Sequence, residues 1–300
     1  MIRSILAAVV LFAAATAAQA QSESPLAYPF PKGNLRTGPE VTFCLDKRNP
    51  TWKVQKAIAR EIAWQMGRPA KFHIHKEAPD DPTRFHPAST RQEFLVLLAN
   101  YCDAYMGLPG STTAAFDYPA DEEMLASRPY YRASFVLVSR DPAVDTLADF
   151  EAGDTVGFQG RGVPYMLAVK MRPDQFAIDR FQSSAALADA LKTGQVDHGV
   201  VYGPTFFDRV PKPAEHGLRV QRVTSLPNMD WFVFAGIRSD RPTLRQKVDE
   251  AIVALLQRGR IGEILEQHGW PSDVFRPAEI EAKLPEDDFG ERSQDGGGDP

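Results

Sequence analysis

Three histidines stand close together in the sequence and are the first residues to consider for metal chemistry. His73 and His75 alternate within Phe72–His75, a strand pattern that places both side chains on one face, and His86 follows in a polar loop. A zinc site needs further ligands in register with such a pair. Because any alternating strand produces pairs of this kind, we predict no metal site.

A glycine-rich segment is the main candidate for binding an anion. Gln159, Gly160, Arg161 and Gly162 precede a helix predicted to begin near Pro164. Backbone N–H groups at a helix start attract negative charge, and the arginine would add to this attraction. The alternative is that Arg161 is an ordinary solvated loop residue, and the sequence leaves both interpretations open.

Other candidates share a position at predicted strand ends or in the loops that follow them. The full set predicted to line a ligand cleft is Asp46, Trp52, Met106, Leu108, Pro109, Tyr130, Tyr131, Gln159, Gly160, Arg161, Gly162, Tyr202 and Phe206. Its tyrosines and Phe206 suit a planar ligand, with ordinary core and hinge packing as the alternative.

No G-x-S-x-G elbow or other nucleophile signature occurs, so we expect no catalytic residues and no enzyme.

The N-terminus predicts export. Arg3 precedes the apolar run Ile5–Ala18, and Ala18-Gln19-Ala20 fits a signal-peptide cleavage site, so we expect cleavage after Ala20 and a periplasmic protein. The run is short for a membrane anchor, which needs about 20 residues, and no membrane insertion is expected. The formal net charge of -5 argues against a nucleic-acid partner.

The elements that must position these residues form two α/β units. The first contains strands at 41–45, 72–75 and 103–108 and helices at 54–66, which Gly67 ends, and at 92–101. The second contains strands at 134–139, 155–158, 199–202 and 231–237 and helices starting at 164 and 184, before closing helices at 244–258 and 261–268. This order predicts a two-lobed α/β fold with two mixed sheets flanked by helices.

The second unit is predicted to be inserted into the first, with two strands as a hinge. The predicted divisions are a signal peptide (1–20), an irregular segment (21–39), lobe 1 (40–140 plus 235–284), lobe 2 (141–234) and a disordered tail (285–300). Ligands of open α/β sheets bind at the carboxyl ends of the strands, here across a cleft between the lobes.

Several segments resemble the type II periplasmic substrate-binding proteins of ABC importers. They are S-R-P-Y before the hinge, T-L-A-D-F-E-A-G-D-T-V-G-F-Q-G after it, A-L-A-D-A-L-K-T-G-Q-V-D-H-G-V-V, and the two closing helices. The resemblance covers nearly all of residues 40–275 and implies the type II periplasmic binding fold, with domain closure around a ligand.

A narrower resemblance is to the MxaJ/XoxJ-type proteins that accompany PQQ-dependent methanol dehydrogenases. It is carried by C-D-A-Y-M-G-L-P, R-P-Y-Y-R-A-S-F-V-L-V-S-R and V-V-Y-G-P. In that group the cysteine before the aspartate pairs with one on the first strand, which implies a Cys44–Cys102 disulfide. The residues alone favour one disulfide in an exported chain, with two buried thiols as the alternative.

Amino-acid-binding members of the larger family typically carry an arginine soon after the third strand and an acid in the second lobe. Here the loop reads G-S-T-T-A-A-F-D-Y with no arginine before Arg128, and V-V-Y-G-P-T-F-F has no acid. A two-lobed dehydratase would need a paired acid and base, which the sequence does not reveal.

The resemblances imply an accessory factor of a PQQ-dependent dehydrogenase, acting through partner contact or maturation. The alternative is a monomeric solute-binding subunit that works with an ABC permease and binds a planar or anionic molecule. PQQ itself would then be a ligand rather than a cofactor, and no cofactor is expected.

Overall fold

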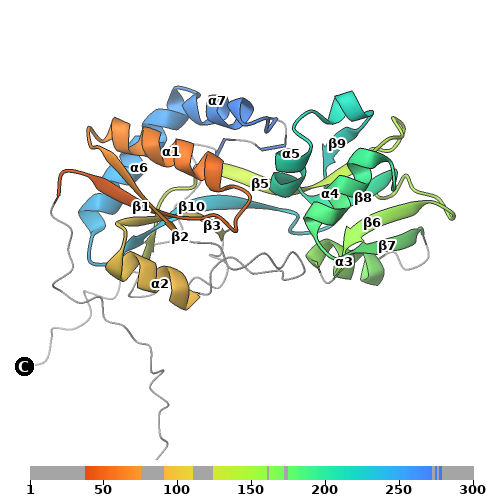
Figure 1. The fold of residues 1–300 in the computed structure, drawn as a ribbon, viewed down its shortest axis with the longest axis horizontal. Coiled ribbons are helices and arrows are strands. Elements are labelled where there is room, and N and C mark those ends of the chain that lie inside the picture. The colour runs from red at the N-terminus through yellow and green to blue at the C-terminus, as the bar shows by residue number, and fades with distance from the viewer. Residues whose placement is uncertain are drawn as a thin grey trace, which may run out of the picture.

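Two α/β lobes joined by two long strands make up the fold (Figure 1). The computed structural model describes residues 38–75, 91–110, 124–160, 162–171, 175–271, 274–275 and 277–278. The predicted signal peptide, most of the segment 21–39, the tail 285–300, His86 and Arg161 lie outside the described residues.

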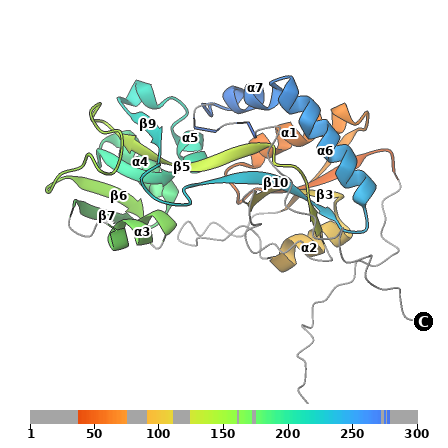
Figure 2. The same cartoon turned by 180° about the vertical axis from the view of Figure 1, so that it is seen from behind.

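Lobe 1 is built on a sheet with strand order β2-β1-β3-β10-β5. Its elements are β1 (Val41–Asp46), α1 (Trp52–Gln65), β2 (Ala70–His75), α2 (Arg91–Asn100), β3 (Ala104–Gly110), β4 (Met124–Ala126), α6 (Pro242–Gln257) and α7 (Arg260–Gln267). β1 is parallel to β2 and β3, whereas β10 is antiparallel to β3. Helices α1, α6 and α7 cover one face of this sheet and α2 the other (Figures 1 and 2).

Lobe 2 continues the same path of strands in the order β5-β8-β6-β7. Its elements are β6 (Thr155–Gln159), α3 (Val163–Met171), β7 (Ala177–Phe181), α4 (Ser184–Thr193), β8 (His198–Tyr202), α5 (Gly203–Arg209), the 3-10 turn η1 (Pro213–His216) and β9 (Arg219–Arg222). β6 is parallel to β7 and β8, and β5 is antiparallel to β8 and β9.

The hinge consists of β5 (Tyr131–Ser139) and β10 (Asp230–Arg238). They pair antiparallel between the lobes, with Tyr131 opposite Val233 and Ser134 opposite Asp230.

The arrangement of strands and helices confirms the predicted mixed α/β fold of two sheets. The predicted helices and strands among the described residues lie within three residues of the observed bounds, and Gly67 with φ 67° ends α1.

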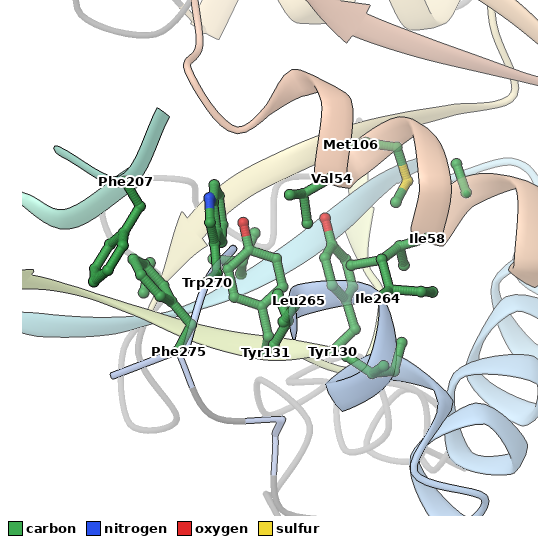
Figure 3. Packing of buried hydrophobic residues seen from close by; sticks show 14 of the residues in the cluster. Val54, Ile58, Met106, Tyr130, Tyr131, Phe207, Ile264, Leu265, Trp270 and Phe275 are labelled. Carbon is green, nitrogen blue, oxygen red and sulfur yellow. The ribbon is translucent and has the colours of Figure 1, made fainter. Parts of the chain in front are cut away.

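One apolar core runs through the hinge from lobe 1 into lobe 2. A single cluster joins Ile58 of α1 and Leu265 of α7 to Leu191 of α4 and Phe207 of α5. The segment after α7 is part of the connection, because the Trp270 ring packs on Tyr131 and on Phe275, which in turn contacts Phe207 (Figure 3). None of the described helices has the length and apolar character needed to cross a bilayer.

This C-terminal crossing also pairs with the edge of β5. The Ala278 amide donates to the Tyr130 carbonyl at 3.2 Å, and Pro277 forms a bridge with Tyr131. Close packing continues at Gly203, where an added Cβ would lie 2.6 Å from the Ser134 carbonyl oxygen and 2.9 Å from the Phe275 ring. The lobes are thus held by the two hinge strands and by this third segment.

A disulfide joins Cys44 of β1 to Cys102, which lies between α2 and β3. Both cysteines are buried in a separate apolar cluster that includes Phe94 and Leu98 of α2. The bond closes a separation of 58 residues and fixes α2 against the sheet. It is the pairing implied by the family resemblance.

Removing this disulfide should cost much of the stability of lobe 1. Because a loop of this length loses considerable entropy in the unfolded state when it is closed, the double variant Cys44→Ala/Cys102→Ala should lose about 4 kcal/mol of unfolding free energy. Urea denaturation measures the loss. Reductant should destabilise the wild type and leave the double variant unaffected; equal midpoints for the two proteins would contradict the prediction.

Candidate functional site

The carboxyl ends of the parallel strands in both lobes meet the hinge. At the end of β3, Pro109 and Gly110 lie opposite Val233 and Phe232 of β10. At the end of β8, Tyr202 lies opposite Phe135 of β5. Since open α/β sheets bind ligands at these ends, the middle of the hinge is where a ligand would contact both lobes.

Three aromatic side chains form what we call the hinge aromatic group: Phe135 of β5, Tyr202 of β8 and Trp231 of β10. The Tyr202 and Trp231 rings are stacked with centroids 5.7 Å apart and an interplanar angle of 9°. Phe135 meets both edge-on, at 5.8 Å and 5.5 Å. All three are only partly buried, so the group offers an apolar surface between the lobes.

Burial raises the pKa of the Tyr202 phenol above its ordinary value. The hydroxyl therefore stays protonated at neutral pH. The buried, neutral hydroxyl accordingly adds no charge to the aromatic surface of the stack.

Charged residues of β5, β9 and β10 form what we call the hinge ion cluster: Arg132, Arg222 and Asp230. One Asp230 carboxylate oxygen, Oδ2, accepts from an Nη of Arg222 at 2.5 Å and lies 3.0 Å from an Nη of Arg132. The Arg132 guanidinium also lies over the Phe232 ring, 4.6 Å from its centroid. The three charged side chains are 25–27% exposed.

The structure places Tyr130 and Tyr131 in the core, where neither side chain is exposed. Tyr131 receives a hydrogen bond from Gln55 Nε2 at 2.7 Å, and the Tyr130 hydroxyl donates to Gln55 Oε1. The Gly107 amide in turn donates to the Tyr130 hydroxyl at 3.0 Å. The two tyrosines therefore brace α1 and β3 beneath the predicted cleft instead of lining it.

Burial raises the pKa of both tyrosines well above the ordinary range. Their hydroxyls consequently act only as neutral donors and acceptors within this network. Gly107 has φ 90°, and a Cβ there would lie 3.3 Å from the Gln55 amide, which leaves little room for any other residue.

Other predicted cleft residues are also core residues. Phe206 is fully buried against Phe207, and Met106 and Leu108 are 3% and 4% exposed. The apolar character of Met106 and Leu108, read from the sequence as a cleft rim, serves packing under α1 and α2. Pro109, by contrast, is partly exposed at the end of β3.

The residues after β1 are held by local contacts. The Asp46 carboxylate is buried and accepts from the Arg48 side chain, with the closest contact at 2.8 Å. Trp52 is partly exposed at the start of α1, with the Lys47 ammonium 5.8 Å from its ring centroid. Next to it, Lys53 pairs across the lobes with Asp208 of α5 at 3.3 Å.

The glycine-rich segment before α3 makes mostly internal hydrogen bonds. The Gly160 amide donates to the Phe181 carbonyl at 2.8 Å, and the Gly162 amide donates to the Gln159 carbonyl at 3.1 Å. The Gln159 side chain accepts from Ser184 Oγ at 2.6 Å. These two amides are therefore engaged within lobe 2, and Arg161, on which the anion prediction partly rests, lies outside the described residues.

One histidine of the predicted pair contacts an aromatic side chain. The His73 ring stacks on Tyr101, with centroids 4.6 Å apart. Within the described ranges, no three His, Cys, Asp or Glu side chains gather closely enough to hold a metal ion.

Most of the residues at the hinge were not predicted from the sequence. Tyr202 was in the predicted set, but Phe135, Trp231 and the hinge ion cluster were not. The sequence feature that could have revealed them is an aromatic residue in each hinge strand with a charged residue shortly before it. These residues are Arg132 before Phe135 and Asp230 before Trp231. Only the strand register places these residues together.

Comparison with solved structures identifies the fold. The second substrate-binding domain of a protein assigned as an amino acid ABC transporter from Streptococcus pneumoniae has a TM-score of 0.56 and 14% identity, covering 76% of this chain and 99% of that domain. Substrate-binding domain 2 of GlnP from Lactococcus lactis, in an open conformation, has a TM-score of 0.56 and 12% identity, covering 78% and 97%. The fold is that of the type II periplasmic binding proteins.

Sequence comparison assigns no family. No family profile matches the chain. A component of the INO80 complex of mouse is 39% identical over 75 residues, which are 24% of this chain. The chain spans 37% of the length of that relative.

The tyrosine–glutamine network gives a stability prediction. Tyr130→Phe keeps the ring but leaves the Gly107 amide and Gln55 Oε1 with unmet hydrogen bonds, so unfolding free energy should fall by about 1–3 kcal/mol. Chemical denaturation measures this. Tyr101→Phe is the control, since Tyr101 is 47% exposed and its ring contact survives; equal small effects for both variants would refute the role assigned to Tyr130.

Proposed function

We propose that the protein is a periplasmic solute-binding subunit of an ABC importer, and that its ligand has a planar, unsaturated part. The observation that carries the proposal is the hinge aromatic group, which lies where the carboxyl ends of strands from both lobes converge. A flat molecule stacked there would contact β5, β8 and β10 at once. Contact with both lobes is what couples ligand binding to domain closure in a two-lobed protein.

The proposed ligand is not a standard amino acid. The sequence from 111 to 123 has no arginine, and β8 is followed by Gly203 and Pro204 rather than an acid. The first acid in α5, Asp208, is paired with Lys53. An aromatic surface, with Gly203 and Pro204 after β8 in place of an acid, favours a planar molecule such as PQQ.

Titration with PQQ and a panel of aromatic metabolites tests this function. A ligand present at 100 times its Kd should stabilise the folded protein by about 2.7 kcal/mol and raise its Tm. Trp231→Leu should abolish most of that increase because it removes the stacked ring. The exposed residue Trp64, at 68%, provides the matched control Trp64→Leu, which should respond like the wild type.

Two results would count against the proposal. A Tm that no member of the panel raises would contradict the aromatic ligand class. Equal responses in the Trp231→Leu and wild-type proteins would place the ligand elsewhere. The Tm of each variant without ligand must be measured first, since Trp231 also contributes to packing.

A second candidate function is the accessory role beside a PQQ-dependent methanol or alcohol dehydrogenase. The observation that favours it is the Cys44–Cys102 disulfide, the pairing implied by the MxaJ/XoxJ resemblance. In this role the protein would act through contact with the dehydrogenase or in its maturation.

Affinity capture separates the two functions. The tagged protein, expressed in methanol-grown cells of its source, should retain the quinoprotein if the accessory role holds, through an interface above about 1,000 Å². The Trp231→Leu variant should retain it equally well, because that ring is only partly exposed in the hinge. Recovery of a permease and ATPase without the quinoprotein would reject the accessory role.

A further inference from the structure

We propose that a groove along helix α6 is the docking site of residues 279–284 of the same chain, which we call the tail segment. Figure 2 shows α6 at the surface of lobe 1. The groove is bounded by α6 between Arg245 and Gln257 and, on its other side, by Arg128, and its volume is about 420 Å³. No residue of the hinge aromatic group lines this groove, so the inference is independent of the proposed function.

The last residue that the structure describes lies beside this groove. The Ala278 amide donates to the Tyr130 carbonyl at 3.2 Å, and Tyr130 is two residues from Arg128. Ala278 also belongs to a small apolar cluster that Leu256 of α6 contacts. Leu256 directly precedes Gln257, at one end of the groove. The chain that continues from Ala278 therefore starts at an end of the groove.

The length of the groove matches that of the tail segment. The lining residues of α6, from Arg245 to Gln257, extend over about 18 Å, because each helical residue rises by about 1.5 Å. An extended chain as long as the tail segment reaches about 20 Å. The tail segment is thus long enough to pass along the whole groove.

The sequence of the tail segment fits a groove with one apolar side. It reads E-I-E-A-K-L, so charged and apolar residues alternate strictly. In an extended chain this alternation places Ile280, Ala282 and Leu284 on one side. The apolar part of the groove consists of Val253 and Ala254, which are both partly exposed. Docking would remove both apolar surfaces from water, which is favourable.

The charges of the groove suit the same segment. Arg245 pairs with Asp249 at 2.8 Å, so these two charges balance each other. Arg128 adds positive charge close to the point where the described chain ends, and the tail segment begins with the acids Glu279 and Glu281. Ion pairs at an exposed groove contribute little free energy, so the apolar contacts should account for most of the stabilisation.

Thermal denaturation of two truncated chains tests the docking. Removal of residues 279–300 should lower the Tm by about 4 °C or more, because it uncovers the apolar side of the groove. Removal of residues 285–300 is the matched control and should leave the Tm within about 1 °C of that of the full chain, because the tail segment is kept. Equal Tm values for the full chain and the chain that ends at Ala278 would overturn the inference.

Single substitutions test the two partners separately. Ile280→Asp in the full chain should lower the Tm as the longer truncation does, whereas Phe289→Asp, which lies beyond the tail segment, should not. Val253→Asp changes the groove, and it should lower the Tm of the full chain more than the Tm of the chain that ends at Ala278. Equal losses in these two backgrounds would show that Val253 does not contact the tail segment, and the groove would be rejected as its site.

Light scattering after size-exclusion chromatography distinguishes docking within one chain from docking between two copies. The full chain and the chain that ends at Ala278 should both be monomers. A dimer that is lost when residues 279–300 are removed would mean that the tail segment docks on a second copy, and the inference of docking within the chain would be overturned.

Discussion

The antiparallel pairing of β5 with β10 is the constraint on which the rest of the structure depends. These strands complete the sheet of lobe 1, carry the chain into and out of lobe 2, and bring Phe135 and Trp231 together with Tyr202. A one-residue change in their register would turn their side chains to opposite faces and separate the rings from each other. The positions of the three rings are therefore set by the pairing of the hinge strands and not by the loops.

Much of the fold could be predicted because the apolar pattern of each element agrees with its surroundings. β1 is mostly apolar because it is buried on both faces, and α1 repeats apolar residues such as Ile58 and Ile62 toward the sheet. Short elements were missed where the pattern is weak. β7 is largely exposed, and α5 begins with Gly203-Pro204, which resembles a loop signal in sequence.

The site was less predictable, for a physical reason. Tyrosine has an apolar ring and a polar tip, so the sequence does not reveal whether a tyrosine faces a ligand or a buried glutamine. At Tyr130 the partner is Gln55, 75 residues away, and at Tyr202 it is a tryptophan from another strand. Contacts between residues so far apart are set by register and twist, which local pattern does not encode.

The insertion of lobe 2 also imposes an order on folding. The strand that lies between β3 and β5 in the lobe 1 sheet is β10, which the ribosome makes only after all of lobe 2. Until residue 238 is available, β3 presents an unpaired edge, and such edges are sites of aggregation. The strand pairing within lobe 2 and the Cys44–Cys102 loop require no later sequence, whereas Phe207 also packs on Phe275. The sheet of lobe 2 can therefore begin to form while lobe 1 waits for its central strand.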